Sequence, residues 1–214
     1  MDIIILGLDI HGIELAGRLA TVDGYQFLGF VAHDSGSADT NEAGIPESFC
    51  GYPVLGGAEV LGRYPDAMHL PLHVWKREHE FGKQQWTTFI DPLAVVAPGA
   101  QIGTGCIVFP HCFIGANARL DDGVLMLAGA VVNHDCHVGQ RAIITTNVSL
   151  AGSVIVGPGA YIGQAATVRQ YIHVGANSLV GMGSVVVKDV PDGVTVMGNP
   201  ARRGYIRTKN LIQN

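Results

Sequence analysis

Aliphatic residues recur at every sixth position through the carboxyl-terminal half of the chain. An α-helix repeats every 3.6 residues and a β-strand every two, so neither explains a period of six. A triangular left-handed parallel β-helix does, because each flat side takes six residues and three sides complete a coil. At a strand spacing of ~4.8 Å, about five coils would make a prism on the order of 25 Å tall. The series is Val96, Ile102, Val108, Ile114, Leu120, Met126, Val132, Val138, Ile144, Leu150, Val156, Ile162, Val168, Val174, Val180 and Val186.

Two further positions of the repeat fit a narrow prism. Glycine often follows the aliphatic residue, where we expect a tight corner that glycine tolerates best. Small residues stand four positions after the aliphatic residue, where they would fill the interior: Ala100, Cys106, Cys112, Ala118, Ala130, Cys136, Ala142, Ala160 and Ala166. Three of the four cysteines hold this position and Cys50 stands alone. We therefore interpret the cysteines as small apolar side chains in a reducing compartment, not as metal ligands or disulfides.

Residues 1–90 alternate between apolar runs typical of buried strands and stretches with helical periodicity. Strands are predicted at Asp2–Leu8, Tyr25–Ala32 and Ala67–His73, and helices at His11–Val22, Gly57–Arg63 and Val74–Trp86. This order indicates a small parallel α/β domain of Rossmann-like type, covered on both faces. With the junction at Thr87–Pro92, we divide the chain into a Rossmann-like domain (1–90), the β-helix (91–192) and a tail (193–214).

Composition narrows the classes of function. The net charge of −5 and the pI near 5.9 argue against nucleic acid as a main partner. No apolar stretch approaches the length of a membrane span, and Ile3–Leu6 is too short for the apolar region of a signal peptide. We therefore expect a cytoplasmic protein with no membrane insertion.

The loop between the first predicted strand and helix is one candidate binding site. It includes Gly7, His11 and Gly12, and such a loop presents backbone N–H groups and a helix dipole to a phosphate. It matches neither common glycine-rich phosphate motif, so an ordinary turn is the competing interpretation. Asp34 follows the end of the second predicted strand, where related folds place an acid that meets a ribose or base.

His134 is the second candidate. It stands two residues past an aliphatic position, at a corner where side chains point outward. Positions eighteen apart stack on adjacent coils, so Ala116 and Gly152 flank His134 and leave room for a substrate against its ring. Asp135 is placed to orient the imidazole, and histidine is well suited to accept a proton near neutral pH. A solvated surface histidine is the competing interpretation.

A metal site is the third possibility. His137 and His173 stand two coils apart, a spacing that gamma-class carbonic anhydrases use for zinc across a trimer interface. Those enzymes need a third histidine five residues after the second, where this chain has Ser178. We therefore expect no metal.

Several motifs occur together along the chain. They are the Gly7…His11-Gly12 turn, Gly51–Gly56 (GYPVLG), His134-Asp135-Cys136, Leu150-Ala151-Gly152 and Gly198–Arg202 (GNPAR). Together they resemble the sugar O-/N-acyltransferase family of the left-handed β-helix (hexapeptide repeat) type. That family includes bacterial UDP-4-amino-sugar N-acetyltransferases and sialic acid O-acetyltransferases.

The resemblance implies a role for each region. The small domain would hold a nucleotide-sugar through Gly7, His11, Gly12 and Asp34. The β-helix would form a homotrimer, with acetyl-CoA in the groove between neighbouring prisms. His134 maps to the catalytic base, Asp135 to its acidic neighbour, and Gly152 to the glycine whose N–H faces the thioester oxygen. The acetyl-CoA contacts would come from Ala151, Gly152, Gly181, Met182 and Arg202.

We therefore expect an acetyl-CoA-dependent acetyltransferase acting on a nucleotide-linked amino sugar in bacterial surface glycan or glycoprotein biosynthesis. Transfer would be direct, with His134 as general base. Two alternatives stay open: a sugar O-acetyltransferase of the sialic acid type, and a non-catalytic β-helix binding protein.

Overall fold

The structure is a computed structural model that describes residues 1–32, 45–72 and 85–204 of the 214. These residues form two compact units, and the chain passes from the first to the second between Thr87 and Thr88. Asp34 and nearly all of the helix expected at Val74–Trp86 lie outside the described residues. Trp86 itself forms an isolated β-bridge with His69, so the expected helix does not extend to that residue.

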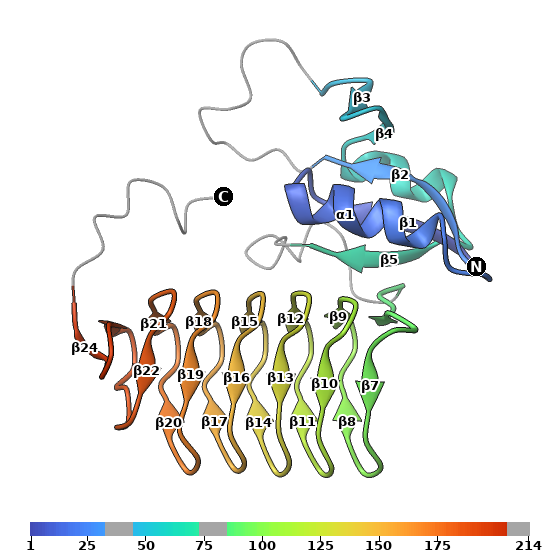
Figure 1. The fold of residues 1–214 in the computed structure, drawn as a ribbon. Coiled ribbons are helices and arrows are strands. Elements are labelled where there is room, and N and C mark those ends of the chain that lie inside the picture. The colour runs from blue at the N-terminus through green and yellow to red at the C-terminus, as the bar shows by residue number, and fades with distance from the viewer. Residues whose placement is uncertain (33–44, 73–84, 205–214) are drawn as a thin grey trace. The chain divides into compact units, whose positions relative to one another are not determined.

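The first unit is built on one five-stranded sheet (Figure 1). Its strands are β1 (Asp2–Leu6), β2 (Gln26–Val31), β3 (Ser48–Phe49), β4 (Tyr52–Gly56) and β5 (Met68–Pro71). The strand order is β3-β4-β2-β1-β5. All neighbouring pairs are parallel except β3 and β4. The sheet is therefore mixed, and the expectation of a purely parallel domain was wrong at this edge.

The antiparallel edge depends on a two-residue turn at Cys50 and Gly51. Both residues have positive φ angles, 47° and 84°. Two consecutive left-handed residues give the turn whose twist matches that of a tight β-hairpin. The turn also leaves Cys50 exposed, unlike the other three cysteines.

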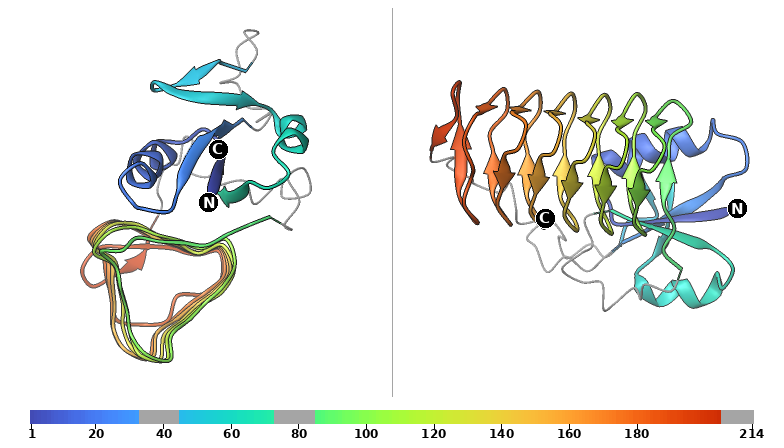
Figure 2. Two further views of the ribbon diagram at one scale, coloured as in Figure 1. Left: turned by 90° about the vertical axis from the view of Figure 1, so that its right-hand side faces the viewer. Right: turned by 90° about the horizontal axis from the view of Figure 1, so that it is seen from below.

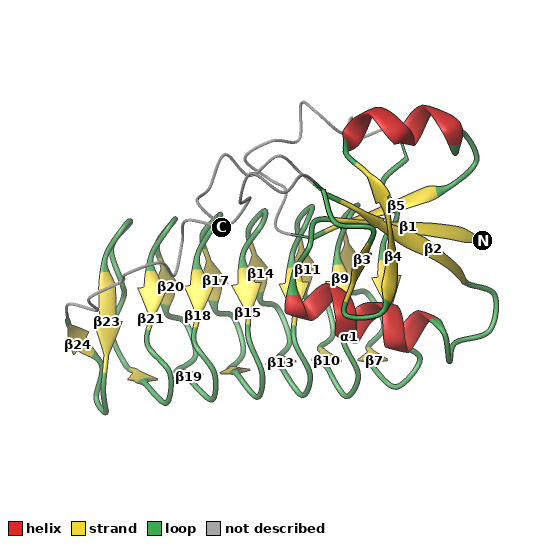
Figure 3. Ribbon diagram, turned by 90° about the horizontal axis from the view of Figure 1, so that it is seen from above, coloured by secondary structure: helices red, strands yellow, loops and turns green. Residues whose placement is uncertain are grey.

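One α-helix, α1 (Ile10–Leu19), joins β1 to β2, and a 3₁₀ helix, η1 (Ala58–Arg63), precedes β5 (Figure 3). Asp9 caps α1, because its side chain accepts a hydrogen bond from the His11 N–H. Leu15 and Leu19 are buried as their helical spacing predicts.

The second unit is a triangular prism with one β-sheet on each of its three sides, seen end-on in the left view of Figure 2. One sheet has six strands: β7 (Val95–Val96), β10 (Phe113–Ile114), β13 (Val131–Val132), β16 (Ser149–Leu150), β19 (Thr167–Val168) and β22 (Val185–Val186). The next has five strands: β8 (Gln101–Ile102), β11 (Arg119–Leu120), β14 (His137–Val138), β17 (Ile155–Val156) and β20 (His173–Val174).

The third sheet has eight strands. They are β6 (Phe89–Ile90), β9 (Ile107–Val108), β12 (Leu125–Met126), β15 (Ile143–Ile144), β18 (Tyr161–Ile162), β21 (Leu179–Val180), β23 (Thr195–Met197) and β24 (Arg202–Arg203). The last pair, β23 and β24, is antiparallel. This hairpin ends the described part of the prism.

The six-residue pattern is confirmed. Each aliphatic residue is the second residue of a two-residue strand, and all of them from Val108 to Val186 are buried. The pattern extends back to Ile90, one six-residue repeat before Val96, where the sequence series began. One side of the prism has six strands, so the prism is about one coil longer than the five expected.

Glycine follows the aliphatic residue for a reason other than the one expected. Gly115 and Gly157 do not have positive φ angles. Instead, a Cβ atom at Gly115 would lie 2.5 Å from the backbone nitrogen of His134, and one at Gly157 would lie 2.5 Å from that of Ala176. The left-handed turn residue comes two positions later, as at Asn117 (φ 58°). Close approach of the next coil therefore selects these glycines.

The interior is filled as expected. Cys106, Cys112 and Cys136 are buried, free thiols within the same cluster as the aliphatic residues. No helix in the described parts of the chain is long and apolar enough to cross a membrane.

Candidate active site

His134 lies on the prism edge where the six-stranded sheet turns into the five-stranded sheet, between β13 and β14. We call this the His134 edge. The His134 side chain is 64% exposed. A Cβ atom on Gly152, one coil further on, would lie 2.5 Å from both Cε1 and Nε2 of the ring. The absence of a side chain at Gly152 is therefore what allows the imidazole to occupy its position.

Asp135 fixes the orientation of this imidazole. Its Oδ2 lies 2.8 Å from His134 Nδ1, and a carboxylate accepts hydrogen bonds, so Nδ1 carries the proton. Nε2 is then the nitrogen with a lone pair. The other carboxylate oxygen, Oδ1, accepts a hydrogen bond from Asn117 Nδ2 at 3.2 Å. The hydrogen bonds from His134 and then from Asn117 lower the pKa of Asp135.

The backbone of Gly152 supplies a donor beside the ring. Its carbonyl accepts the N–H of Tyr171 at 3.3 Å, and the carbonyl of His134 accepts the N–H of Ser153 at 2.9 Å. Within the described residues, the Gly152 N–H itself has no hydrogen-bond partner. A base nitrogen and an unused N–H therefore lie on the same small patch, as acyl transfer requires.

A hollow of about 630 Å³ continues along the His134 edge toward the carboxyl end of the prism. It begins at Ala151 and is lined further on by Arg169, Tyr171, Val185 and Val187, among others. Tyr171 is 74% exposed and has a φ angle of 62°. A non-glycine residue in this conformation costs roughly 1–2 kcal/mol.

Sequence reasoning missed Arg169 and Tyr171. The six-residue register contained the signal, because Tyr171 lies two coils beyond Asp135 in the same column of corner residues. It also missed Asn117, which lies one coil before Asp135 in that column.

Three residues expected at the acetyl-CoA site lie elsewhere on this chain. Gly181 and Met182 follow β21 on the edge between the eight-stranded and six-stranded sheets, not on the His134 edge. Met182 is 74% exposed. Arg202 is in β24, exposed, and its Nη1 donates to the Ala201 carbonyl at 3.0 Å. A single copy of the chain therefore does not bring these residues together with His134.

The turn after β1 has the expected form. Gly7 (φ 104°) ends the strand, and its N–H donates to the Val31 carbonyl at 2.9 Å. A Cβ atom on Gly12 would lie 2.9 Å from Phe30 Cε1, so helix packing explains that glycine. The Asp9 carboxylate accepts from His11 Nδ1 at 2.8 Å, and this hydrogen bond raises the pKa of His11. Sequence reasoning did not single out Asp9.

The sheet order places this turn at a favourable point. The chain leaves β1 through α1 to β2 on one side and later returns to β5 on the other side of β1. Ligands of open α/β sheets bind at the carboxyl ends of strands where the order reverses in this way. Gly7 and His11 lie at that end of β1.

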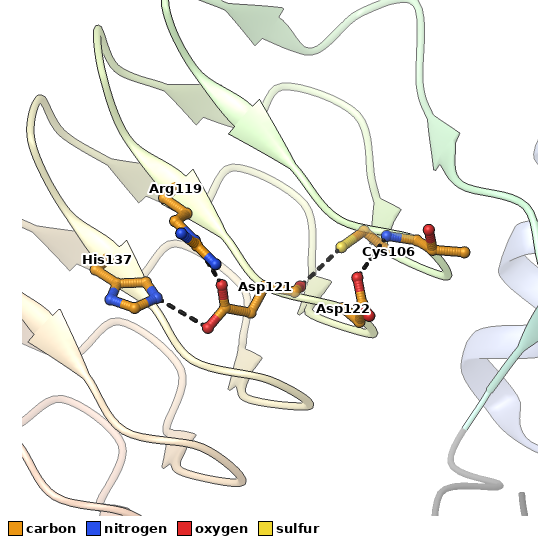
Figure 4. Close-up of polar contacts among 6 residues, drawn as sticks. Cys106, Arg119, Asp121, Asp122 and His137 are labelled. Atoms are coloured by element: carbon orange, nitrogen blue, oxygen red, sulfur yellow. Dashed lines mark hydrogen bonds and ion pairs between the residues drawn. The ribbon is translucent and has the colours of Figure 1, made fainter.

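His137 belongs to a separate cluster (Figure 4). Its Nε2 lies 2.8 Å from Asp121 Oδ2, and Arg119 Nε lies 2.7 Å from Asp121 Oδ1. The group lies beside a hollow of about 430 Å³, on the side of the prism formed by β11 and β14. No grouping of three or more metal-binding side chains occurs in the described ranges of the chain.

No family model matches this chain, and no curated protein sequence does. Solved structures do match over nearly its full length. The acetyltransferase domain of PglB from Neisseria gonorrhoeae, in complex with acetyl coenzyme A, is 28% identical (TM-score 0.80; 94% of this chain, 98% of that chain). PerB from Caulobacter crescentus, in complex with CoA and GDP-perosamine, is 27% identical (TM-score 0.81; 96% and 98%).

A third match, WeeI from Acinetobacter baumannii, is 22% identical with a TM-score of 0.55 over 95% of this chain and all of that chain, and supports the fold. The two closer matches share both the amino-terminal unit and the prism with this chain, because each covers at least 94% of it. The structural homologues of this chain are left-handed β-helix sugar N-acetyltransferases.

Proposed function

We propose that the chain is an acetyl-CoA-dependent N-acetyltransferase whose acceptor is a nucleotide-linked amino sugar. The observation that carries the proposal is the arrangement on the His134 edge. Asp135 holds Nδ1, so Nε2 is the proton acceptor, and the unused N–H of Gly152 lies beside it. The homologues with acetyl coenzyme A, and with CoA and GDP-perosamine, support the choice of donor and acceptor class.

The reaction needs no covalent enzyme intermediate. The sugar amine attacks the thioester carbonyl carbon while His134 Nε2 takes a proton from the amine. Asp135 stabilises the imidazolium that forms. The carbonyl oxygen becomes an oxyanion on the Gly152 N–H, a role in which one donor is typically worth ~3–4 kcal/mol. Collapse of the tetrahedral intermediate breaks the C–S bond, and the CoA thiolate takes the proton back from His134.

The hollow along the His134 edge suits the pantetheine arm of the donor. It begins at Ala151, next to the oxyanion donor, and its aliphatic lining at Val185 and Val187 matches an arm that is largely uncharged. Gly181, Met182 and Arg202 lie away from this edge, so they would reach the donor only from a neighbouring copy. We therefore propose a homotrimer with donor grooves between prisms.

We propose that the nucleotide of the acceptor binds to the first unit. The carboxyl end of β1 is where the strand order reverses, and the start of α1 there offers backbone N–H groups to a phosphate. His11 lies partly buried at this helix start, and its raised pKa favours the cation that a diphosphate would attract.

The test is thiol release from acetyl-CoA with a panel of nucleotide-linked amino sugars and free hexoses. The natural chain should release thiol with at least one amino-sugar nucleotide. His134→Ala should lower the rate by 10²-fold or more, since a general base is typically worth about 10²–10⁴. His173→Ala is the matched control, because His173 is an exposed histidine of the prism on β20.

Two results would contradict the proposal. Turnover that His134→Ala leaves unchanged would remove His134 as the base. No turnover with any acceptor, together with no binding of CoA, would favour a non-catalytic binding protein on the same fold.

A further inference from the structure

Asn117 contacts the Asp135 carboxylate on the oxygen that His134 does not use. It is one coil before Asp135 in the same column of left-handed corner residues, with φ angles of 58° and 57°. Its side-chain amide donates to Asp135 Oδ1 at 3.2 Å, while Asp135 Oδ2 accepts from His134 Nδ1 at 2.8 Å. The three side chains therefore form a chain of two hydrogen bonds that ends at the imidazole.

Asp135 needs such a partner because its side chain is 51% exposed. A carboxylate at this exposure can rotate about its side-chain torsions and turn to water. With Oδ1 held by Asn117, Oδ2 faces the ring. Besides Asn117, the side chain that hydrogen-bonds to Asp135 is that of His134 itself.

The same asparagine position recurs at two other corners of the prism. Asn117, Asn147 and Asn177 all have left-handed φ angles, and each places its side-chain oxygen close to where a Cβ atom would lie on the glycine one coil earlier. The three sites therefore share one structural role in forming the corner. Of the three, all of which lie in the described residues, only Asn117 donates a hydrogen bond to a neighbouring carboxylate, that of Asp135.

We propose that Asn117 is a positioning residue for the acetyl transfer, which holds the Asp135 carboxylate so that it keeps Nδ1 of His134 protonated and Nε2 aimed at the acceptor amine. The inference rests on the proposed function, because it concerns the same base. It adds a role that corner formation does not require, since Asn147 and Asn177 form their corners without a carboxylate partner in the described structure.

The test compares Asn117→Gly with Asn147→Gly. Glycine keeps the left-handed backbone in both variants, so each loses one corner amide at equal backbone cost. Asn117→Gly should lower kcat on the order of tenfold, as expected for a hydrogen bond to a charged group. The KM values for acetyl-CoA and the acceptor should change less than about twofold, and Asn147→Gly should match the natural chain.

A second comparison shows whether Asn117 acts through Asp135. In an Asp135→Gly background, adding Asn117→Gly should lower kcat no further, because the carboxylate it holds is already gone. A readout without turnover is the carboxyl titration of Asp135 by NMR. There, Asn117→Gly should move the pKa of Asp135 upward toward its ordinary value, since the hydrogen bond from Asn117 lowers it.

The outcomes separate the two proposals. Equal kcat for Asn117→Gly and Asn147→Gly, in an enzyme that still depends on His134, would overturn the role of Asn117 alone. An additive loss in the Asp135→Gly background would also overturn it. If thiol release does not depend on His134, the proposed function fails and the role of Asn117 falls with it.

Discussion

His134 has an accessible face because of the residue one coil away. Gly152 leaves the ring uncovered, and its own N–H is left without a partner in the described structure. The same residue therefore provides the space that the ring occupies and, in the proposed reaction, a donor for the oxyanion. A side chain at this position would remove that space, whereas the backbone N–H would remain.

Gly152→Ala tests the space. Gly152 does not have a positive φ angle, so alanine is compatible with its backbone. Its Cβ atom, however, would lie 2.5 Å from the His134 ring and would push the imidazole away from Asp135. We expect kcat to fall by about 10²-fold, as for loss of a general base, with little change in melting temperature.

Gly62→Ala is the control for this variant, because a Cβ atom there meets nothing within 4 Å. Steady-state kinetics and thermal unfolding of the two variants give the comparison. Full activity in Gly152→Ala would show that the ring does not need its observed position.

The phase of the repeat was enough to predict that His134, Asp135 and Gly152 lie together. An outward corner position, an adjacent acid and a glycine eighteen residues on led to His134, Asp135 and Gly152. Counting eighteen residues back from Asp135 leads to Asn117, but the sequence analysis did not identify this residue. The repeat also places Tyr171 in the same column of corner residues as Asp135. It does not predict the left-handed backbone of Tyr171, because that conformation is usually signalled by asparagine, aspartate or glycine.

At the scale of the element, the contact between successive corners limits what each coil can contain. The residue after the aliphatic position lies against the backbone of the next coil, as at Gly115 and Gly157. The conformational freedom of glycine is used two positions later, at residues such as Gly99 and Gly105. Sequence alone shows that glycine is frequent at a corner but does not show which of these two causes selects it.

Gly157→Ala should therefore destabilise the prism. The added Cβ atom would lie 2.5 Å from the nitrogen and 2.8 Å from the Cα of Ala176, and backbone cannot move aside without separating two coils. We expect the free energy of unfolding to fall by about 1–3 kcal/mol, the usual cost of an overpacked contact. Denaturant unfolding followed by far-UV circular dichroism measures it.

An exposed corner position provides the comparison for Gly157→Ala. Gln164→Ala changes a side chain that points to solvent and should alter stability by no more than about 0.5 kcal/mol. Equal stability of the two variants would mean that the coils can separate at little cost.

The amino-terminal strands show where pattern reading was weaker. The strands β1, β2 and β5 are largely buried, and their positions were predicted to within two residues. The hairpin of β3 and β4 was not predicted, because cysteine, which has the left-handed conformation at position 50, is not a residue that usually signals a turn.

At the scale of the whole molecule, a buried histidine makes the stability of the first unit depend on pH. His69 in β5 is 1% exposed, and neither ring nitrogen has a hydrogen-bond partner in the structure of residues 1–32, 45–72 and 85–204. Burial lowers the pKa of His69 below 6.5. The folded chain therefore binds this proton less readily than the unfolded chain.

The first unit should accordingly lose stability in mild acid. The contribution of neutral His69 is complete above about pH 6.5 and is lost as the pH falls below that value toward the lowered pKa. His11 acts in the opposite sense, because its raised pKa stabilises the fold at low pH and that contribution is lost as the pH rises. His69→Leu should flatten the acid side of the profile.

Tryptophan fluorescence isolates this effect. Both tryptophans of the chain, Trp75 and Trp86, precede the prism in sequence. Urea midpoints between pH 5 and 8, measured by fluorescence for the natural chain and His69→Leu, give the profile. The same slope below pH 6.5 in both proteins would show that His69 is not its cause.

The strand register also limits how the length of this protein can change. Paired residues in successive coils are eighteen apart, as in Val131 with Ser149. Insertion or deletion of six residues would keep every aliphatic side chain inside, but it would carry Gly152 to a different edge from His134. The core is thus compatible with insertions or deletions in multiples of six residues. Between His134 and Gly152, however, only multiples of eighteen residues would keep the two on the same edge.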